Sequence, residues 1–139
     1  MAVTITLTEP YYRDFHRRKG SCFDDQEAIE VYKATQELQK NWPNCLGNAQ
    51  ISPDIVKEGD FYYCRFNFTS AQQIKFRVCF RTEQKGTDTN IVVLTCRTKQ
   101  ELSRGSKTGT DAWKLHMKTV GKSRWNDYRK NKIRSWKIY

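Results

Sequence analysis

Basic and apolar side chains alternate over residues 74–81, which would place several cations on one side of an extended segment. Successive side chains of a β-strand point to opposite faces, so Lys75, Arg77 and Arg81 share a face and apolar residues occupy the other. Arg65 lies on a neighbouring strand candidate, residues 61–69. Because arginine binds phosphate oxygens through paired hydrogen bonds, this face is a candidate phosphate-binding surface; a solvated sheet face is the alternative.

A second basic run follows the next strand candidate. Its Lys and Arg side chains are suited to hold a scissile phosphate, or to stabilise the charge that forms when an RNA 2′-hydroxyl attacks it. Glu101 is the only carboxylate in the run, and it is a candidate general base or a partner for a neighbouring cation. A flexible basic loop is the alternative. The cations are Arg97, Lys99, Arg104 and Lys107.

Aromatic and basic residues are interleaved in the segment that ends the chain. This composition is typical of surfaces that stack bases while neutralising the nucleic-acid backbone. The three-residue spacing of Trp125 and Tyr128 also suits a helix face packed on the core, and both readings stay open. The aromatic residues are Trp125, Tyr128, Trp136 and Tyr139, and the basic ones include Arg124, Arg129, Lys130, Lys132, Arg134 and Lys137.

Two histidines, His16 and His116, are the remaining candidates for acid–base chemistry near neutral pH. Packing at the surface or half-way into the core is the alternative role for His116. The five cysteines include no C-x-x-C pair, so we expect small buried thiols and neither disulfides nor a zinc site. The sequence has no phosphate-binding glycine loop and no carboxylate cluster suited to a metal nuclease, so we expect no metal and no cofactor.

Charge is distributed unevenly along the chain. Residues 1–70 carry 8 basic and 10 acidic side chains, whereas residues 71–139 carry 17 basic and 5 acidic ones. A segregated positive field attracts polyanions through phosphate neutralisation and counterion release. We therefore expect nucleic acid or the ribosome as the partner, and a solubilising basic surface is the alternative.

Nothing in the sequence indicates a membrane segment or a leader. The longest purely apolar run, residues 91–94, is far shorter than the roughly 20 residues of a spanning helix. The first residues have neither a basic start nor a long apolar stretch. We expect a cytoplasmic protein without membrane contact.

Periodicity predicts the elements that must position these residues. Alternation predicts a strand over residues 2–8, and helical spacing predicts a helix over 24–41 that Asp24 and Glu27 cap. Three antiparallel strands follow over 61–69, 74–81 and 91–96, and a last helix begins near Asp111 and breaks or bends at Gly121.

These elements predict an α+β fold: a small antiparallel β-sheet packed on one face by N-terminal and C-terminal helices, in the order β-α-(α)-β-β-β-α. Residues 1–121 would form the single domain. Residues 122–139 would be a basic aromatic tail or an extension of the last helix.

This order of elements resembles the small ribosome-dependent messenger-RNA-cleaving toxins of the RelE/HigB superfamily. Residues 74–81 are similar to the family's strand with a phosphate-contacting arginine, and residues 90–99 are similar to its next strand and basic turn. The resemblance covers roughly residues 2–120 and is one of topology and composition. It implies a metal-independent endoribonuclease and an acidic, antitoxin-like protein partner. Binding and charge stabilisation would fall to Arg77, Arg81, Arg97, Lys99 and Tyr128.

The sequence therefore predicts a basic nucleic-acid-binding protein, RNA being favoured over DNA, with toxin-like endoribonuclease activity at the ribosome. The order helix–strand–strand–strand–helix also resembles a double-stranded-RNA-binding domain. The alternative function is a non-catalytic regulator, for example phage- or plasmid-encoded, that binds DNA, RNA or a host protein. The candidate catalytic residues are Arg77, Arg81, Lys99, Glu101 and His116. The candidate nucleic-acid-binding residues are Arg65, Lys75, Arg97, Arg104, Lys107, Arg124, Trp125, Tyr128 and Arg129.

Overall fold

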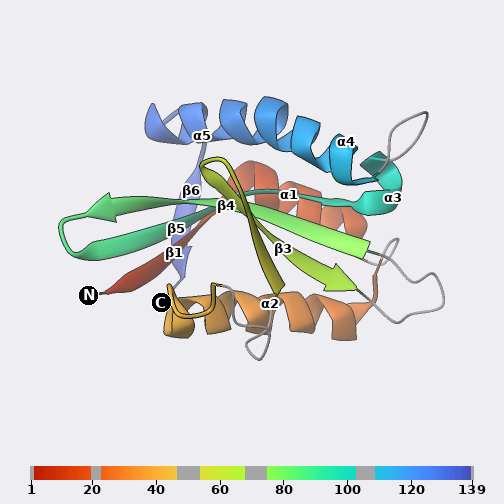
Figure 1. Ribbon diagram of the computed structural model, residues 1–139, viewed down its shortest axis with the longest axis horizontal. Coiled ribbons are helices and arrows are strands. Elements are labelled where there is room, and N and C mark those ends of the chain that lie inside the picture. The colour runs from red at the N-terminus through yellow and green to blue at the C-terminus, as the bar shows by residue number, and fades with distance from the viewer. Residues whose placement is uncertain (1, 20–22, 47–53, 68–74, 103–108, 139) are drawn as a thin grey trace.

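The computed structural model describes residues 2–19, 23–46, 54–67, 75–102 and 109–138 (Figure 1). Its strands are β1 (Val3–Thr8), β2 (Asp54–Glu58), β3 (Phe61–Asn67), β4 (Lys75–Lys85), β5 (Asp88–Thr98) and β6 (Ser135–Ile138). Its helices are α1 (Glu9–Arg18), α2 (Asp25–Asn41), α3 (Lys99–Leu102), α4 (Gly109–His116) and α5 (Lys122–Arg129), with a π-helical turn η1 (Met117–Gly121) between the last two.

The strands form one six-stranded sheet in the order β2-β3-β4-β5-β1-β6, which confirms the α+β class with a mostly antiparallel sheet. β1 pairs in parallel with β5, and the other neighbours are antiparallel. Two strands were not expected. β2 lies between the predicted helix over 24–41 and the predicted strand over 61–69, where the sequence analysis placed no element, and β6 lies in the predicted tail or helix extension.

Helices cover both faces of the sheet, so the expectation that they lie on one face is wrong. α2 packs against one face, and the continuous helical layer of α4, η1 and α5 covers the other (Figure 1). The reason is visible in β5, whose apolar side chains alternate between the two cores. Ile91 and Val93 pack on the α2 side, whereas Val92 and Leu94 pack against the helical layer.

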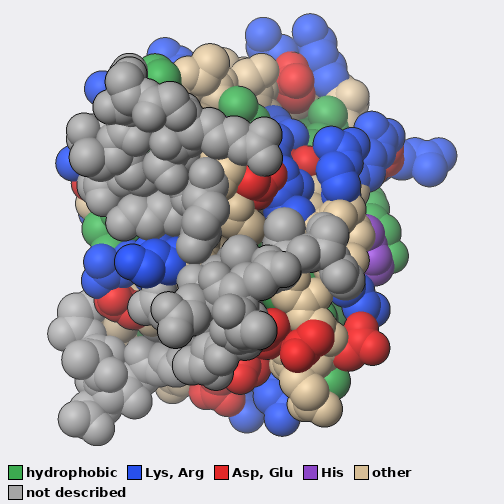
Figure 2. Space-filling model, turned by 90° about the vertical axis from the view of Figure 1, so that its right-hand side faces the viewer, with side chains coloured by type: hydrophobic (Ala, Val, Ile, Leu, Met, Phe, Trp, Pro, Cys, Tyr) green, Lys and Arg blue, Asp and Glu red, His purple; other side chains and the backbone are tan. Residues whose placement is uncertain are grey.

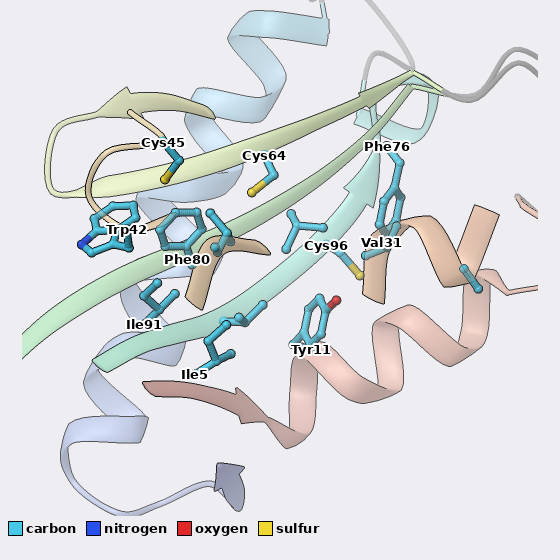
Figure 3. Close-up of a cluster of buried hydrophobic side chains, with 14 of the residues drawn as sticks. Ile5, Tyr11, Val31, Trp42, Cys45, Cys64, Phe76, Phe80, Ile91 and Cys96 are labelled. Atoms are coloured by element: carbon cyan, nitrogen blue, oxygen red, sulfur yellow. The ribbon is translucent and has the colours of Figure 1, made fainter. Parts of the chain in front are cut away.

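The larger core lies between the sheet and helices α1 and α2 (Figure 3). Phe76 and Phe80 of β4 are fully buried there, and Trp42 packs its ring edge against Phe80 at 5.6 Å between centroids. Tyr11 of α1 and Cys96 of β5 close the cluster near the start of α1. Burial of this aromatic surface supplies the main stabilisation of the sheet on this side.

Local signals place α2 where the sequence predicts it. The Asp24 side chain accepts a hydrogen bond from the Glu27 amide, and the Glu27 side chain accepts one from the Asp24 amide, so the expected capping box is present. Helical hydrogen bonding ends at Trp42, directly before Pro43.

The predicted hairpin between β4 and β5 has a two-residue turn. Lys85 pairs with Asp88, and Gly86 adopts a left-handed φ of 64°, as a type II′ turn requires at its first central position. Further along, a bulge in the ladder pairs Cys79 with Thr95 and Phe80 with Val93. The unpaired residue, Leu94, allows both Leu94 and Thr95 to reach the helical layer.

The last helix continues past Gly121, with an irregular turn at the place where the sequence predicts a break or a bend. The Lys122 amide donates to the Met117 carbonyl, which closes a π-helical turn, and α5 continues from there. Trp113 and Met117 are buried, and Gly121 rather than Val120 is the next residue to be buried. A π-turn holds more residues than an α-turn, so it keeps a four-residue repeat facing the sheet.

The expected buried thiols are confirmed for Cys64, Cys79 and Cys96, which are free and lie in the cores. Burial raises the pKa of all three far above the ordinary value for a thiol. None of these thiols is suited to nucleophilic catalysis. Cys22 lies outside the described residues. Among the described residues, no helix has the length and apolar character needed to span a bilayer. In the same part of the chain, no group of three or more His, Cys, Asp or Glu side chains could hold a metal ion.

Candidate nucleic-acid interface

A buried ionic network joins α1 to β5 and α5. Asp14 of α1 is almost fully buried, and its Oδ2 accepts hydrogen bonds from Nη1 of Arg124 and is paired with Nη1 of Arg97, both at 2.6 Å. Burial alone would raise the pKa of Asp14, but the two guanidinium groups outweigh it and lower the pKa. Arg124 also donates to the Leu94 carbonyl at 3.0 Å. The network therefore fixes α1 and α5 against the end of β5.

Glu101 belongs to a second part of this network. Arg18 donates to both of its carboxylate oxygens, at 2.8 and 2.6 Å, and the amide and hydroxyl of Thr98 donate to Oε2 at 2.7 and 2.9 Å. Burial opposes ionisation, yet these donors lower the pKa of Glu101 to about 2. A carboxylate with all these donors is a weak proton acceptor, so its geometry suits the ion-pairing alternative rather than a general base.

His116 is also held inside the protein. Its Nε2 lies 2.9 Å from the Thr95 hydroxyl, and its ring stacks on Trp113 at 5.1 Å between centroids. Burial, followed by the charges of Arg97 and Arg124, lowers the pKa of His116 to about 4. The imidazole is therefore neutral at pH 7 and packed against the sheet, as the packing alternative expects.

The basic face of β4 is not open to solvent, which corrects the expectation for Arg77. Only 7% of Arg77 is exposed, and its Nη1 donates to the carbonyls of Phe66 and Phe76 at 3.3 and 3.1 Å. Burial and the neighbouring charge of Arg65 lower the pKa of Arg77. Arg81 lies over the Trp125 ring at 4.6 Å from its centroid, under the helical layer. Sequence reasoning missed this layer, which occupies the place expected for phosphate.

Arg65 and Lys75 are the members of the predicted binding set on β3 and β4 that remain exposed. Arg65 forms an ion pair with Asp54 on the neighbouring strand β2. Arg104, Lys107 and the side chain of Lys99 lie outside the part of the chain that the structure describes.

The aromatic residues of α5 pack inward. Trp125 is buried against Val92 and Leu94, and the Tyr128 hydroxyl donates to Glu83 at 2.7 Å and accepts from Asn90 at 3.2 Å. Burial and the Glu83 carboxylate raise the pKa of Tyr128 to about 12. Of the two readings left open by the sequence, the structure favours core packing for this pair. Arg129 remains exposed and lies 3.8 Å from Glu83.

The outer surface of the helical layer carries a row of lysines that the sequence analysis did not single out. Lys114, Lys118 and Lys122, which we term the lysine stripe, lie one turn apart and all three are exposed. Lys114 is 3.4 Å from Glu58, whereas Lys118 and Lys122 make no ion pair with any described residue. The four-residue repeat of lysines, each directly after a position of the buried face at Trp113, Met117 and Gly121, was the signal in the sequence that could have revealed the stripe.

Charge is segregated between α2 and the helical layer of α4, η1 and α5. Residues of α2 include four acidic and two basic side chains, whereas the lysine stripe is followed by exposed Lys130 and Lys132 beyond α5. Figure 2 shows Lys and Arg gathered mainly over the upper part of the visible face, and Asp and Glu mainly over the lower part, on the side where Figure 1 places α2. A polyanion would therefore be drawn to the helical layer of α4, η1 and α5.

Comparison with protein-family models, curated proteins and solved structures finds no match to this chain. The functional argument consequently depends on the geometry and charge of the protein itself.

Proposed function

We propose that this protein binds nucleic acid through the lysine stripe and the basic residues that follow it, without cleaving the bound strand. The observation that supports this most strongly is the segregation of charge: exposed lysines line the layer of α4, η1 and α5, whereas α2 on the opposite face carries more acidic than basic side chains. Side chains one helical turn apart are about 5–6 Å from each other, close to the phosphate spacing along a strand. Each phosphate contact releases counterions and adds affinity without regard to sequence.

Binding without catalysis is the better-supported form of this function. The four predicted catalytic residues whose side chains the structure describes all have structural partners. Arg77 donates to two carbonyls, and Arg81 lies over the Trp125 ring and 3.9 Å from Asp60. Glu101 is bound by an arginine and a threonine, and His116 lies beside a buried threonine. We favour the cytoplasm as the compartment, because free buried thiols suit a reducing environment. We keep the preference for RNA over DNA from the sequence analysis.

The test compares two double variants that remove the same charge from opposite faces. Affinity for a fluorescent 20-nucleotide single-stranded RNA, and for the DNA of the same sequence, is measured from 50 to 400 mM salt. We expect Lys118→Gln/Lys122→Gln to lower the slope of log K against log salt by about 1.4, since each single-strand phosphate contact contributes about 0.7. The control, Lys33→Gln/Lys40→Gln on acidic α2, should leave the slope unchanged.

Three results would overturn the proposal in different ways. Equal losses in both double variants would mean that overall charge, not the stripe, holds the strand. The absence of salt-dependent affinity for either nucleic acid would point to a protein partner. Cleavage of the labelled RNA by the wild-type protein would restore the endoribonuclease function and refute binding without catalysis.

A further inference from the structure

A groove of about 640 Å³ runs between α1 and α2 on the side of the sheet away from the lysine stripe. Its floor is apolar and includes Phe15, Val31 and Ile138, while Ile29 and Tyr32 of α2 form one rim and remain 46% and 54% exposed. Its volume falls in the range of sites that bind small molecules, and large exposed apolar side chains around a concave surface are typical of such sites.

Aromatic rings continue the other rim of this groove. Tyr12 and His16 lie one turn apart on α1, with ring centroids 4.2 Å from each other, and Trp136 of β6 lies 5.5 Å from Tyr12. Tyr12 and Trp136 are both more than two-fifths exposed. Exposed rings in a row can stack successive planar groups, and their contacts with each other hold them in fixed positions.

The two walls of the groove differ in charge. On the α1 side, Arg17 and Arg13, which is ion-paired with Glu9, are exposed beside the aromatic row, and Arg134 lies near Trp136. On the α2 side, Asp25 lines the groove and is 3.6 Å from Lys19 of the opposite wall. A phosphate is attracted to the first wall and repelled by the second, so a nucleic-acid strand has one favourable path, along α1 and β6.

We infer that this groove receives an unstacked base of a single-stranded nucleic acid, while the phosphates adjoining that base lie against α1 and β6. A base has apolar faces that match Tyr12, Phe15 and Tyr32, and a polar edge that needs both donors and acceptors. The Lys19 ammonium and the Asp25 carboxylate supply both at the mouth of the groove. This inference rests on the proposed function and assigns it a preference for single strands over duplexes, because a paired base cannot leave its stack without cost.

The test removes a ring from each wall without changing charge. Binding of a 12-nucleotide single-stranded RNA and of a blunt RNA duplex is measured for Tyr12→Ala and Tyr32→Ala. We expect each variant to weaken single-strand binding on the order of tenfold, to leave duplex binding unchanged and to keep the salt slope of the wild type, because stacking contacts release no counterions. Ile29→Ala should act in the same direction. Leu115→Ala, an equally exposed apolar side chain on α4, is the matched control and should have no effect.

Photo-cross-linking locates the base directly. A 12-nucleotide RNA that contains 4-thiouridine is irradiated with the wild-type protein, and the cross-linked tryptic peptides are identified by mass spectrometry. We expect cross-links in the peptide of residues 20–33, which carries Ile29 and Tyr32.

The outcomes separate this inference from the proposed function. Salt-dependent binding with no cross-link in residues 20–33, and with full affinity in Tyr32→Ala, would overturn the groove and keep the stripe. Equal weakening of single strands and duplexes by the ring variants would also overturn it. Loss of self-association in Ile29→Ala, with RNA affinity intact, would identify the groove as a protein interface instead. If the wild-type protein binds no nucleic acid, both proposals fail together.

Discussion

Asp14 carries one negative charge and is shared by two guanidinium groups inside the protein. A buried carboxylate is costly unless such donors compensate it, and removing one member of a buried ion pair costs about 3–5 kcal/mol. Arg97 and Arg124 are therefore committed to the architecture at the point where α1, β5 and α5 meet. The same holds for Glu101, whose contacts with Arg18 and Thr98 attach α3 to α1. In this region, charge maintains the fold and is not available to a substrate.

The lowered pKa of His116 makes the stability of the protein depend on pH. Its ordinary pKa is 6.5 and its pKa in the folded protein is about 4, so between these values the unfolded chain binds more protons and stability falls as the pH falls. From pH 7 to pH 5 we expect this one group to cost about 2 kcal/mol of unfolding free energy. The measurement is urea unfolding followed by circular dichroism at pH 7, 6 and 5.

The variant His116→Gln should flatten that pH dependence while keeping a partner for the Thr95 hydroxyl. His16→Gln, at an exposed position of α1, is the matched control for the exchange of a histidine for glutamine. An unchanged slope in His116→Gln would show that this histidine is not buried in its neutral form.

At the scale of elements, the two glycines Gly86 and Gly121 have opposite roles. Gly86 has a φ of 64° and open space around its Cβ position, so Gly86→Ala should destabilise the hairpin by about 1 kcal/mol through backbone strain alone. Gly121 has helical dihedrals, and an added Cβ would meet Phe61 and Cys79 at ordinary contact distances of 3.6 and 3.7 Å. Gly121→Ala should therefore be neutral or stabilise by about 0.5–1 kcal/mol. Urea midpoints of the two variants test both predictions. A large loss of stability in Gly121→Ala would mean that the helix needs a glycine at this position.

Much of the fold was predictable because the apolar residues of β4, β5 and α2 recur at the spacing of a strand or a helix. The short strands β2 and β6 do not, since an edge strand of four or five residues is defined by the partner it pairs with. The sequence did contain evidence that both faces of the sheet are covered. Residues 91–96 of β5, the strand next to β4, are apolar on both faces, as a strand with helices on both sides must be. Site residues were harder to predict. The composition shows that arginines are abundant, but it does not show that several of them form ion pairs with Asp14 and Glu101. The lysine stripe emerges only once Trp113, Met117 and Trp125 are known to face the sheet.

At the scale of the whole molecule, the cationic layer should cost the free protein some stability. Like charges one helical turn apart repel each other by a few tenths of a kcal/mol, and Lys118 has such a neighbour on either side. Lys118→Gln should therefore raise the stability of the free protein by about 0.5 kcal/mol at low salt, even as it weakens nucleic-acid binding. Thermal unfolding in 20 mM salt, with and without a single-stranded RNA, measures both effects. A lower melting temperature for the free variant would mean that Lys118 supports the fold.

The pairing of β1 with β5 on one side and with β6 on the other also bears on when the protein becomes functional. β1 is synthesised early, but both of its partners come from the second half of the chain, and the two ends of the described chain lie on the same side of the molecule (Figure 1). Contacts between segments so distant in sequence form late and slowly. Ile138 and Trp136, which complete the groove and its aromatic row, belong to β6, far from β1 and α1 in the sequence. The groove therefore forms only after β6 has been synthesised and has paired with β1, so any ligand of the groove has to wait for that pairing.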